Sequence, residues 1–160
     1  MRNGEIHLGV IVEGVDVAGL WVRPYRKDQL AAVLREDDSF TGPVVAFSDL
    51  VERDIVGLEG SSTLTRLRFQ QAALLLHPIA LRVQVRSFEA VCRAVEAGLG
   101  IGVLPLNAAR SFSTAMGLRI LPLSEPWAQR RMLLCARSEP ESDTPLSALV
   151  RHLEACAAKD

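Results

Sequence analysis

Short apolar runs separated by turn residues recur along the chain and predict alternating strands and helices. The run over 6–12 is too short for a helix and is flanked by glycines, so it predicts a buried strand. Residues 20–25 predict a second strand and residues 30–34 a third, with a turn at Lys27–Asp28 between them. The polar stretch 35–43 then predicts a loop.

Helical spacing alternates with further strands in the rest of the chain. Ser48 is the expected N-cap of a short helical turn. A helix is expected from near Ser62 to Pro78, another after Ser87, a third over 108–115, and a last one from Pro145 with Thr144 as its N-cap. The remaining strands are expected at 55–58, 81–85, 101–104, 118–121 and 132–136. This order predicts a parallel sheet covered by helices.

Composition narrows the class of protein. The 160 residues are 49% hydrophobic, and 18 basic against 19 acidic residues give a net charge of −1. The length fits one domain or two small lobes, and the near-neutral charge makes nucleic-acid binding by this chain a poor expectation. No uninterrupted apolar run reaches membrane-spanning length, and the first residues lack a signal-peptide pattern, so we expect a cytoplasmic protein. The cysteines form no CxxC pair and are expected to be small buried apolar residues: Cys92, Cys135 and Cys156.

Two predicted helix starts offer groups that bind anions. Gly60, Ser61 and Ser62 follow the strand over 55–58 and precede a helix, so they present free backbone N–H groups and two hydroxyls at the carboxyl end of a strand. That combination suits a carboxylate or another small anion, although a simple N-cap explains it equally well. Ser87 repeats the arrangement after the strand over 81–85. Two such starts in one lobe favour a ligand site, but a plain cap explains either one alone.

Other patterns indicate no catalytic chemistry. The glycines of residues 98–102 follow a helix and open a strand, so they predict a tight turn and not a nucleotide-binding loop. The acidic run 36–38 predicts a solvated loop. No nucleophile elbow or metal-ligand spacing is present. The histidines are scattered along the chain and are expected to be structural or to lie at the surface: His7, His77 and His152. We therefore expect no catalytic residue, no metal site and no cofactor.

Five blocks, in order, resemble the effector-binding domain of LysR-type transcriptional regulators. The most specific is the stretch 85–105, in which a strand, a serine and a helix precede the run Ala97-Gly-Leu-Gly-Ile-Gly-Val-Leu-Pro. The other blocks cover 4–9, 22–28, 47–50 with 57–62, and 121–127 with 130–131. Together they cover essentially the whole chain.

The resemblance implies an α/β fold of the periplasmic-binding-protein-like type 2, with two lobes joined by crossing strands. Residues 23–121 would form lobe II, and residues 1–22 with 122–160 would form lobe I. The family's N-terminal winged helix-turn-helix, its linker helix and the opening elements of lobe I have no counterpart in the sequence. Lobe I is therefore expected to be incomplete, and its exposed apolar edges are expected to favour homo-oligomers.

The resemblance also implies a function. In that family a small-molecule effector, often a carboxylate, binds between the lobes and changes the arrangement of an oligomer on DNA. Full-length relatives contact DNA through the helix-turn-helix, so no nucleic-acid binding is expected of this chain. The alternative is a solute-binding protein of the same fold that takes a small carboxylate. Carried over by position, the effector-binding residues are Gly60, Ser61, Ser62, Ser87, Phe88, Val12, Glu13 and Arg26.

Overall fold

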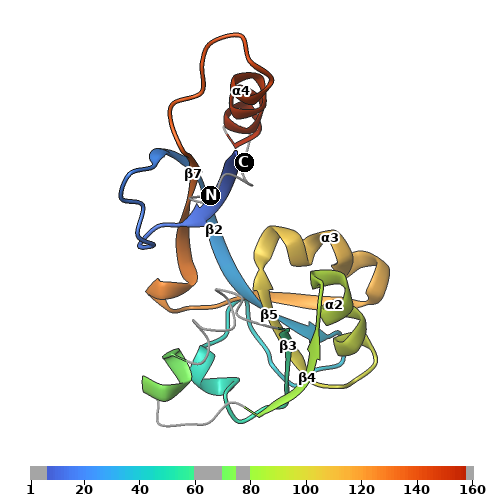
Figure 1. The fold of residues 1–160 in the computed structure, drawn as a ribbon. Coiled ribbons are helices and arrows are strands. Elements are labelled where there is room, and N and C mark those ends of the chain that lie inside the picture. Colours follow the sequence, from blue (N-terminus) through green and yellow to red (C-terminus); the bar gives the residue numbers. More distant parts are fainter. Residues whose placement is uncertain (1–6, 60–69, 75–79, 158–160) are drawn as a thin grey trace. The chain divides into compact units, whose positions relative to one another are not determined.

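The chain forms two compact units in a computed structural model that describes residues 7–59, 70–74 and 80–157 (Figure 1). Unit 1 comprises Met1–Asp28 and Arg130–Asp160, and unit 2 comprises Gln29–Gln129. The chain leaves unit 1 inside strand β2 (Trp21–Arg35) and returns to it inside strand β7 (Gln129–Ala136). Two extended segments thus carry the chain between the units.

Unit 2 is built on a mixed sheet. The strands follow the order β6 (Leu118–Pro122), β2, β5 (Ile101–Pro105), β3 (Ile55–Leu58) and β4 (Leu81–Val85). Strand β3 runs parallel to β4 and β5, but β2 runs antiparallel to β5 and β6. Because β5 and β6 are both antiparallel to β2, the strands β3, β4, β5 and β6 all run in one direction. The parallel arrangement expected for this part of the chain is therefore confirmed, and only β2 runs the other way.

Helices α2 (Phe88–Glu96) and α3 (Leu106–Met116) pack against each other and against the sheet of unit 2 (Figure 1). Two short 3-10 turns complete the unit, η1 (Phe47–Asp49) and η2 (Pro126–Ala128). Residues 70–74 are helical, in agreement with the helix expected from Ser62 to Pro78. The rest of that expected helix lies outside the described residues.

The core of unit 2 lies on both faces of β2. Residues 30–34 of this strand are completely buried. Leu30, Ala32 and Leu34 join a cluster with Phe47 of η1, whereas Val33 faces the cluster beneath α2 and α3. This alternation follows the two-residue period of a strand, and it explains why the run is apolar throughout.

Two local expectations are wrong. Lys27–Asp28 is not a turn, because β2 continues through it, and the Asp28 carboxylate bonds to the Arg130 guanidinium of β7. Ser48 is not an N-cap either. The 3-10 turn η1 begins after Ala46, and the Phe47 amide donates to the Glu125 carboxylate at 2.5 Å. In both cases a residue distant in sequence supplies the partner.

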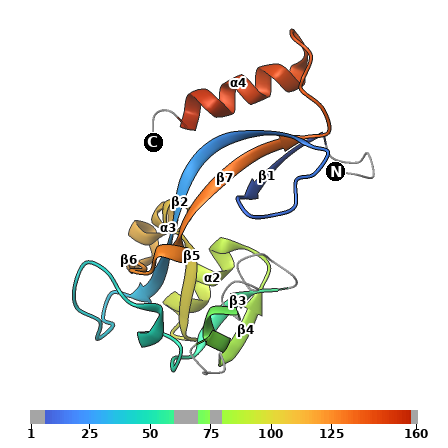
Figure 2. The ribbon, with the colours of Figure 1, turned by 90° about the vertical axis from the view of Figure 1, so that its left-hand side faces the viewer.

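Unit 1 contains β1 (Leu8–Val12), β7, the first part of β2 and helix α4 (Pro145–Ala157) (Figure 2). Strand β1 pairs antiparallel with β7, with Leu8 opposite Ala136. The predicted cap of α4 is confirmed, since the Thr144 hydroxyl accepts from the Ser147 amide at 3.2 Å. Val150 of α4 is buried, but Leu149 is 46% exposed, so only part of the predicted apolar face is covered. In the described residues, no helix is both long and apolar enough to cross a membrane.

Candidate functional site

The carboxyl ends of the parallel strands β3 and β4 lie side by side in unit 2. Leu58 is opposite Val85 in the register, and the Glu59 amide donates to the Val85 carbonyl at 2.7 Å. Immediately after the strands, the Arg86 guanidinium pairs with the Glu59 carboxylate at 2.5 Å. The two loops that follow β3 and β4 therefore start at the same edge of the sheet, which is where open α/β sheets bind ligands.

Helix α2 begins at this edge. Ser87 has extended backbone angles, and its hydroxyl oxygen accepts from the Ala90 amide at 3.1 Å, which confirms the predicted N-cap. The hydroxyl can still donate its own proton to a ligand. The first amides of a helix lack intrahelical acceptors and carry the positive end of its dipole, so this helix start is suited to a negatively charged group.

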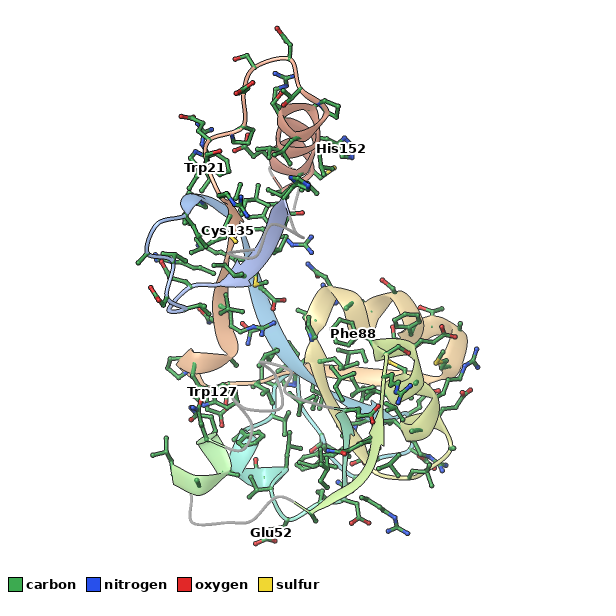
Figure 3. All side chains as sticks on the ribbon, viewed as in Figure 1. Trp21, Glu52, Phe88, Trp127, Cys135 and His152 are labelled. Atoms are coloured by element: carbon green, nitrogen blue, oxygen red, sulfur yellow. The ribbon has the colours of Figure 1, made fainter. Side chains whose placement is uncertain are left out.

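Phe88 occupies a different kind of position from Ser87. Its side chain is half-buried and packs against both apolar clusters of unit 2 (Figure 3). The ring thus fixes the start of α2 on the sheet. The structure places Ser87 and Phe88 beside the ends of β3 and β4. Gly60, Ser61 and Ser62 lie outside the described residues.

The other residues carried over from the resemblance belong to unit 1. Val12 ends β1 opposite Met132, and the Glu13 amide donates to the Arg131 carbonyl at 2.8 Å. The Glu13 carboxylate lies 3.9 Å from the Arg131 guanidinium. Arg26 lies on β2, and its guanidinium stacks 5.2 Å from the centre of the Tyr25 ring.

Two of the three cysteines are too buried to act as nucleophiles. Cys92 on α2 and Cys135 on β7 are fully enclosed, as expected from their apolar surroundings. Burial raises the pKa of both thiols, and at Cys92 the nearby Glu89 carboxylate raises it further. The expectation of burial is wrong for Cys156, which is exposed on α4.

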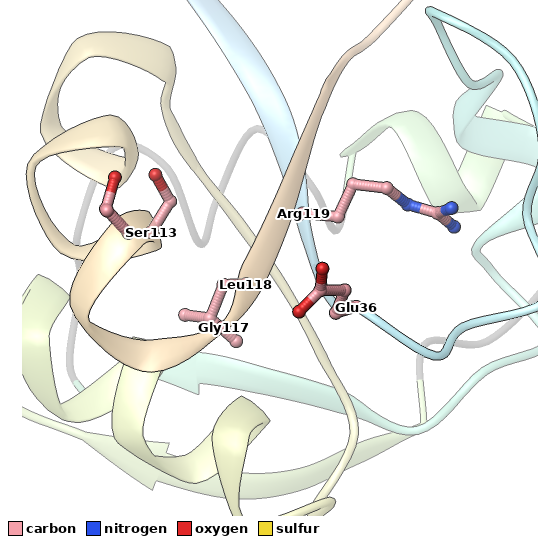
Figure 4. A pocket seen from close by; sticks show the side chains of 6 residues that line it. Glu36, Ser113, Gly117, Leu118 and Arg119 are labelled. Carbon is pink, nitrogen blue, oxygen red and sulfur yellow. The ribbon is translucent and has the colours of Figure 1, made fainter.

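Sequence reasoning missed a cavity of about 290 Å³ in unit 2 (Figure 4). It lies between the C-terminal end of α3, the start of β6 and Glu36, and Ser113 and Thr114 of α3 line it. The guanidinium of Arg119 extends away from Glu36 and donates to the carbonyls of Asp38 and Phe40. Carboxylate and hydroxyl oxygens at the negative end of a helix favour a hydrogen-bond donor, so this cavity does not suit an anion.

Comparison with known proteins decides the family. The profile of the LysR substrate binding domain matches residues 1–157. The chain belongs to this family. The resemblance drawn from the five sequence blocks is thereby confirmed, as is the α/β fold of the periplasmic-binding-protein-like type 2. No curated protein sequence matches the chain significantly.

Solved structures of LysR-type regulators share the fold of this LysR substrate binding domain. The regulatory domain of CcmR from Synechocystis PCC6803, in complex with 2-PG, is 23% identical with a TM-score of 0.80, over 98% of this chain and 76% of that one. The effector binding domain of BenM with its effector benzoate is 18% identical with a TM-score of 0.76, over 99% and 72%. The effector binding domain of QuiR in complex with shikimate is 17% identical with a TM-score of 0.76, over 99% and 75%.

The chain spans 53% of full-length BenM, over 99% of its own length. The match therefore covers only part of full-length BenM, whereas it covers 72% of the BenM effector binding domain. Membership of this family also favours a regulator over the solute-binding protein that shares the fold.

Proposed function

We propose that this LysR substrate binding domain senses a small carboxylate at the edge of unit 2 where β3 and β4 end and α2 begins. The observation that carries the proposal is the Ser87-capped start of α2 beside the end of β3. Benzoate and shikimate, the ligands named for BenM and QuiR, are both carboxylates. A helix N-terminus that also presents a hydroxyl has the charge and the donors to hold such a group.

The same proposal assigns the remaining contacts. Gly60, Ser61 and Ser62 follow Glu59 directly and would add amides and hydroxyls from the loop after β3. Val12, Glu13 and Arg26 of unit 1 stay candidate contacts carried over from the resemblance, and among them the Arg26 guanidinium is the group that would pair with a carboxylate. Unit 2 would correspond to lobe II and unit 1 to lobe I.

The proposed role involves binding and no catalysis. Effector binding would change how a homo-oligomer of the full-length protein sits on DNA, and DNA contacts would come from the helix-turn-helix of that full-length protein. Such a regulator acts where the DNA is, so we propose a cytoplasmic location. Strand β1 lies at one end of the described strand order, and its Val10 side chain is exposed. An exposed apolar edge strand supports self-association.

A thermal-shift screen tests the site. We expect one or more small carboxylates, with benzoate and shikimate in the panel and benzamide as the uncharged counterpart, to raise the melting temperature. Ser87→Ala should lower the stability of the free protein by about 1 kcal/mol through loss of the cap. It should also reduce the shift caused by the carboxylate.

Thr144→Ala is the matched control, because it removes an equivalent hydroxyl cap from α4 in unit 1. It should destabilise the free protein similarly and leave the ligand-induced shift unchanged. A carboxylate shift that survives intact in both Ser61→Ala and Ser87→Ala would show that the effector binds elsewhere.

A further inference from the structure

Helix α4 carries a histidine and a cysteine that face the same way. His152 and Cys156 are four residues apart, a spacing that places side chains on one face of a helix (Figure 3 labels His152). The His152 Nε2 atom lies 3.6 Å from the Cys156 Sγ atom. Both side chains are exposed, so solvent reaches the pair.

This separation matches two ligands of one tetrahedral metal ion. Zinc binds a histidine nitrogen at about 2.0–2.1 Å and a thiolate sulfur at about 2.3 Å, and a tetrahedral angle between them separates the two atoms by about 3.5–3.6 Å. The separation of the two atoms is therefore compatible with a shared metal ion. We propose that His152 and Cys156 form a binding site for a soft divalent cation such as Zn²⁺.

The position on the helix supports a cation. Cys156 lies in the last turn of α4, where the helix dipole is negative, and this turn contains no basic residue. An imidazole and a thiolate together select zinc-like ions over Mg²⁺ and Ca²⁺, which prefer oxygen ligands. Binding replaces the thiol proton of Cys156 with the metal ion and releases that proton to solvent.

The site is open. No group of three or more His, Cys, Asp or Glu side chains with metal-binding geometry occurs in residues 7–59, 70–74 and 80–157. Two protein ligands thus leave two coordination positions for water. This differs from a closed four-ligand structural site, and it makes the metal exchangeable.

Cobalt provides a direct optical test, because Co²⁺ takes zinc sites and a thiolate ligand gives a near-ultraviolet charge-transfer band. Adding Co²⁺ to the protein should produce this band, and Zn²⁺ but not Mg²⁺ should abolish it. Cys156→Ser should lose the band, and His152→Ala should require more Co²⁺ to reach it. Circular dichroism checks that both variants fold, as expected for exposed positions.

His7→Ala is the control, since His7 is exposed and lies on no described helix. It should titrate like the unaltered protein. A second readout is alkylation by iodoacetamide, located by mass spectrometry, from which Zn²⁺ should protect Cys156. The proposal is overturned if no charge-transfer band forms at saturating Co²⁺, if the band persists in Cys156→Ser, or if Zn²⁺ leaves alkylation of Cys156 unchanged.

Discussion

The Asp38 carboxylate accepts three hydrogen bonds from two groups. The Arg53 guanidinium donates at 2.8 and 3.3 Å, and the Phe40 amide donates at 3.2 Å. The Asp38 side chain is only 8% exposed, whereas its neighbour Asp37 is 68% exposed and pairs with Arg35. An acidic run expected to be a solvated loop therefore contains one buried structural carboxylate.

The charge of Asp38 should make stability depend on pH. Its hydrogen bonds to Arg53 hold the pKa of Asp38 below the usual value, although burial opposes this. The unfolded chain then binds a proton more readily than the folded one, so the stabilisation is complete above about pH 4 and is lost as the pH falls through the folded pKa. Asp38→Asn should lower the free energy of unfolding by about 1–3 kcal/mol at pH 7 and by much less at acid pH.

Urea unfolding at a series of pH values measures this difference. Asp37→Asn is the control, because the pKa of Asp37 is also lowered by Arg35 but the pair is exposed and screened by solvent. Equal effects of the two substitutions at pH 7 would contradict the role assigned to Asp38.

At the scale of elements, the link from α2 to β5 depends on three glycines that serve three purposes. Gly98 follows the C-terminal cap of α2 and has φ of 76°, in the left-handed region. Gly100 has φ of 143° and lies against the backbone of Asp54, whose carbonyl accepts from the Ile101 amide at 2.9 Å. A Cβ at Gly102 would lie 2.7 Å from a methyl carbon of Val91 on α2. The tight turn expected here is confirmed, and close packing explains its glycines.

Gly100→Ala should therefore be strongly destabilising. The added methyl group would overlap the carbonyl oxygen of Asp54 while the residue keeps an unfavourable φ, and we expect a loss of about 2 kcal/mol or more. Gly42→Ala is the matched control in unit 2, because Gly42 also has a positive φ, of 113°, but its nearest contact would be at 4.0 Å. Chemical denaturation of the two variants separates the clash from the backbone penalty. A similar loss in both would contradict the packing argument.

Features that depend on residues close together in the sequence could be predicted from it. Features that depend on residues far apart in the sequence could not. The Ser87 and Thr144 caps were predicted because a hydroxyl and an amide three residues later suffice to form them. The hydrogen bond that the Phe47 amide donates at the start of η1 could not be predicted, because its acceptor, Glu125, is 78 residues away. In the candidate site, the start of α2 was likewise predictable, whereas the Glu59–Arg86 pair depends on the register of β3 against β4. The four-residue spacing of His152 and Cys156 is visible in the sequence. It does not match a motif of one ligand type, because the pair combines a histidine with a cysteine.

At the scale of the whole molecule, β2 carries the chain out of unit 1 and β7 carries it back. One ion pair joins the two strands at the boundary of unit 1. Asp28 and Arg130 are the unit-1 residues at the two crossings, and their side chains are 12% and 7% exposed. The Arg130 Nε atom is buried without a partner in the described part of the chain. Two charges withdrawn from water here are stable only together.

This pairing predicts a strong non-additivity. Arg130→Met alone should destabilise the protein by about 3–5 kcal/mol, because it leaves the Asp28 carboxylate buried and uncompensated. Adding Asp28→Leu should recover most of that loss, since two apolar side chains of similar size need no partner. Urea denaturation of both single variants and the double variant gives the coupling free energy. Additive effects would mean that each side chain is solvated independently. The ion pair would then not stabilise β2 and β7 at the crossings between the units.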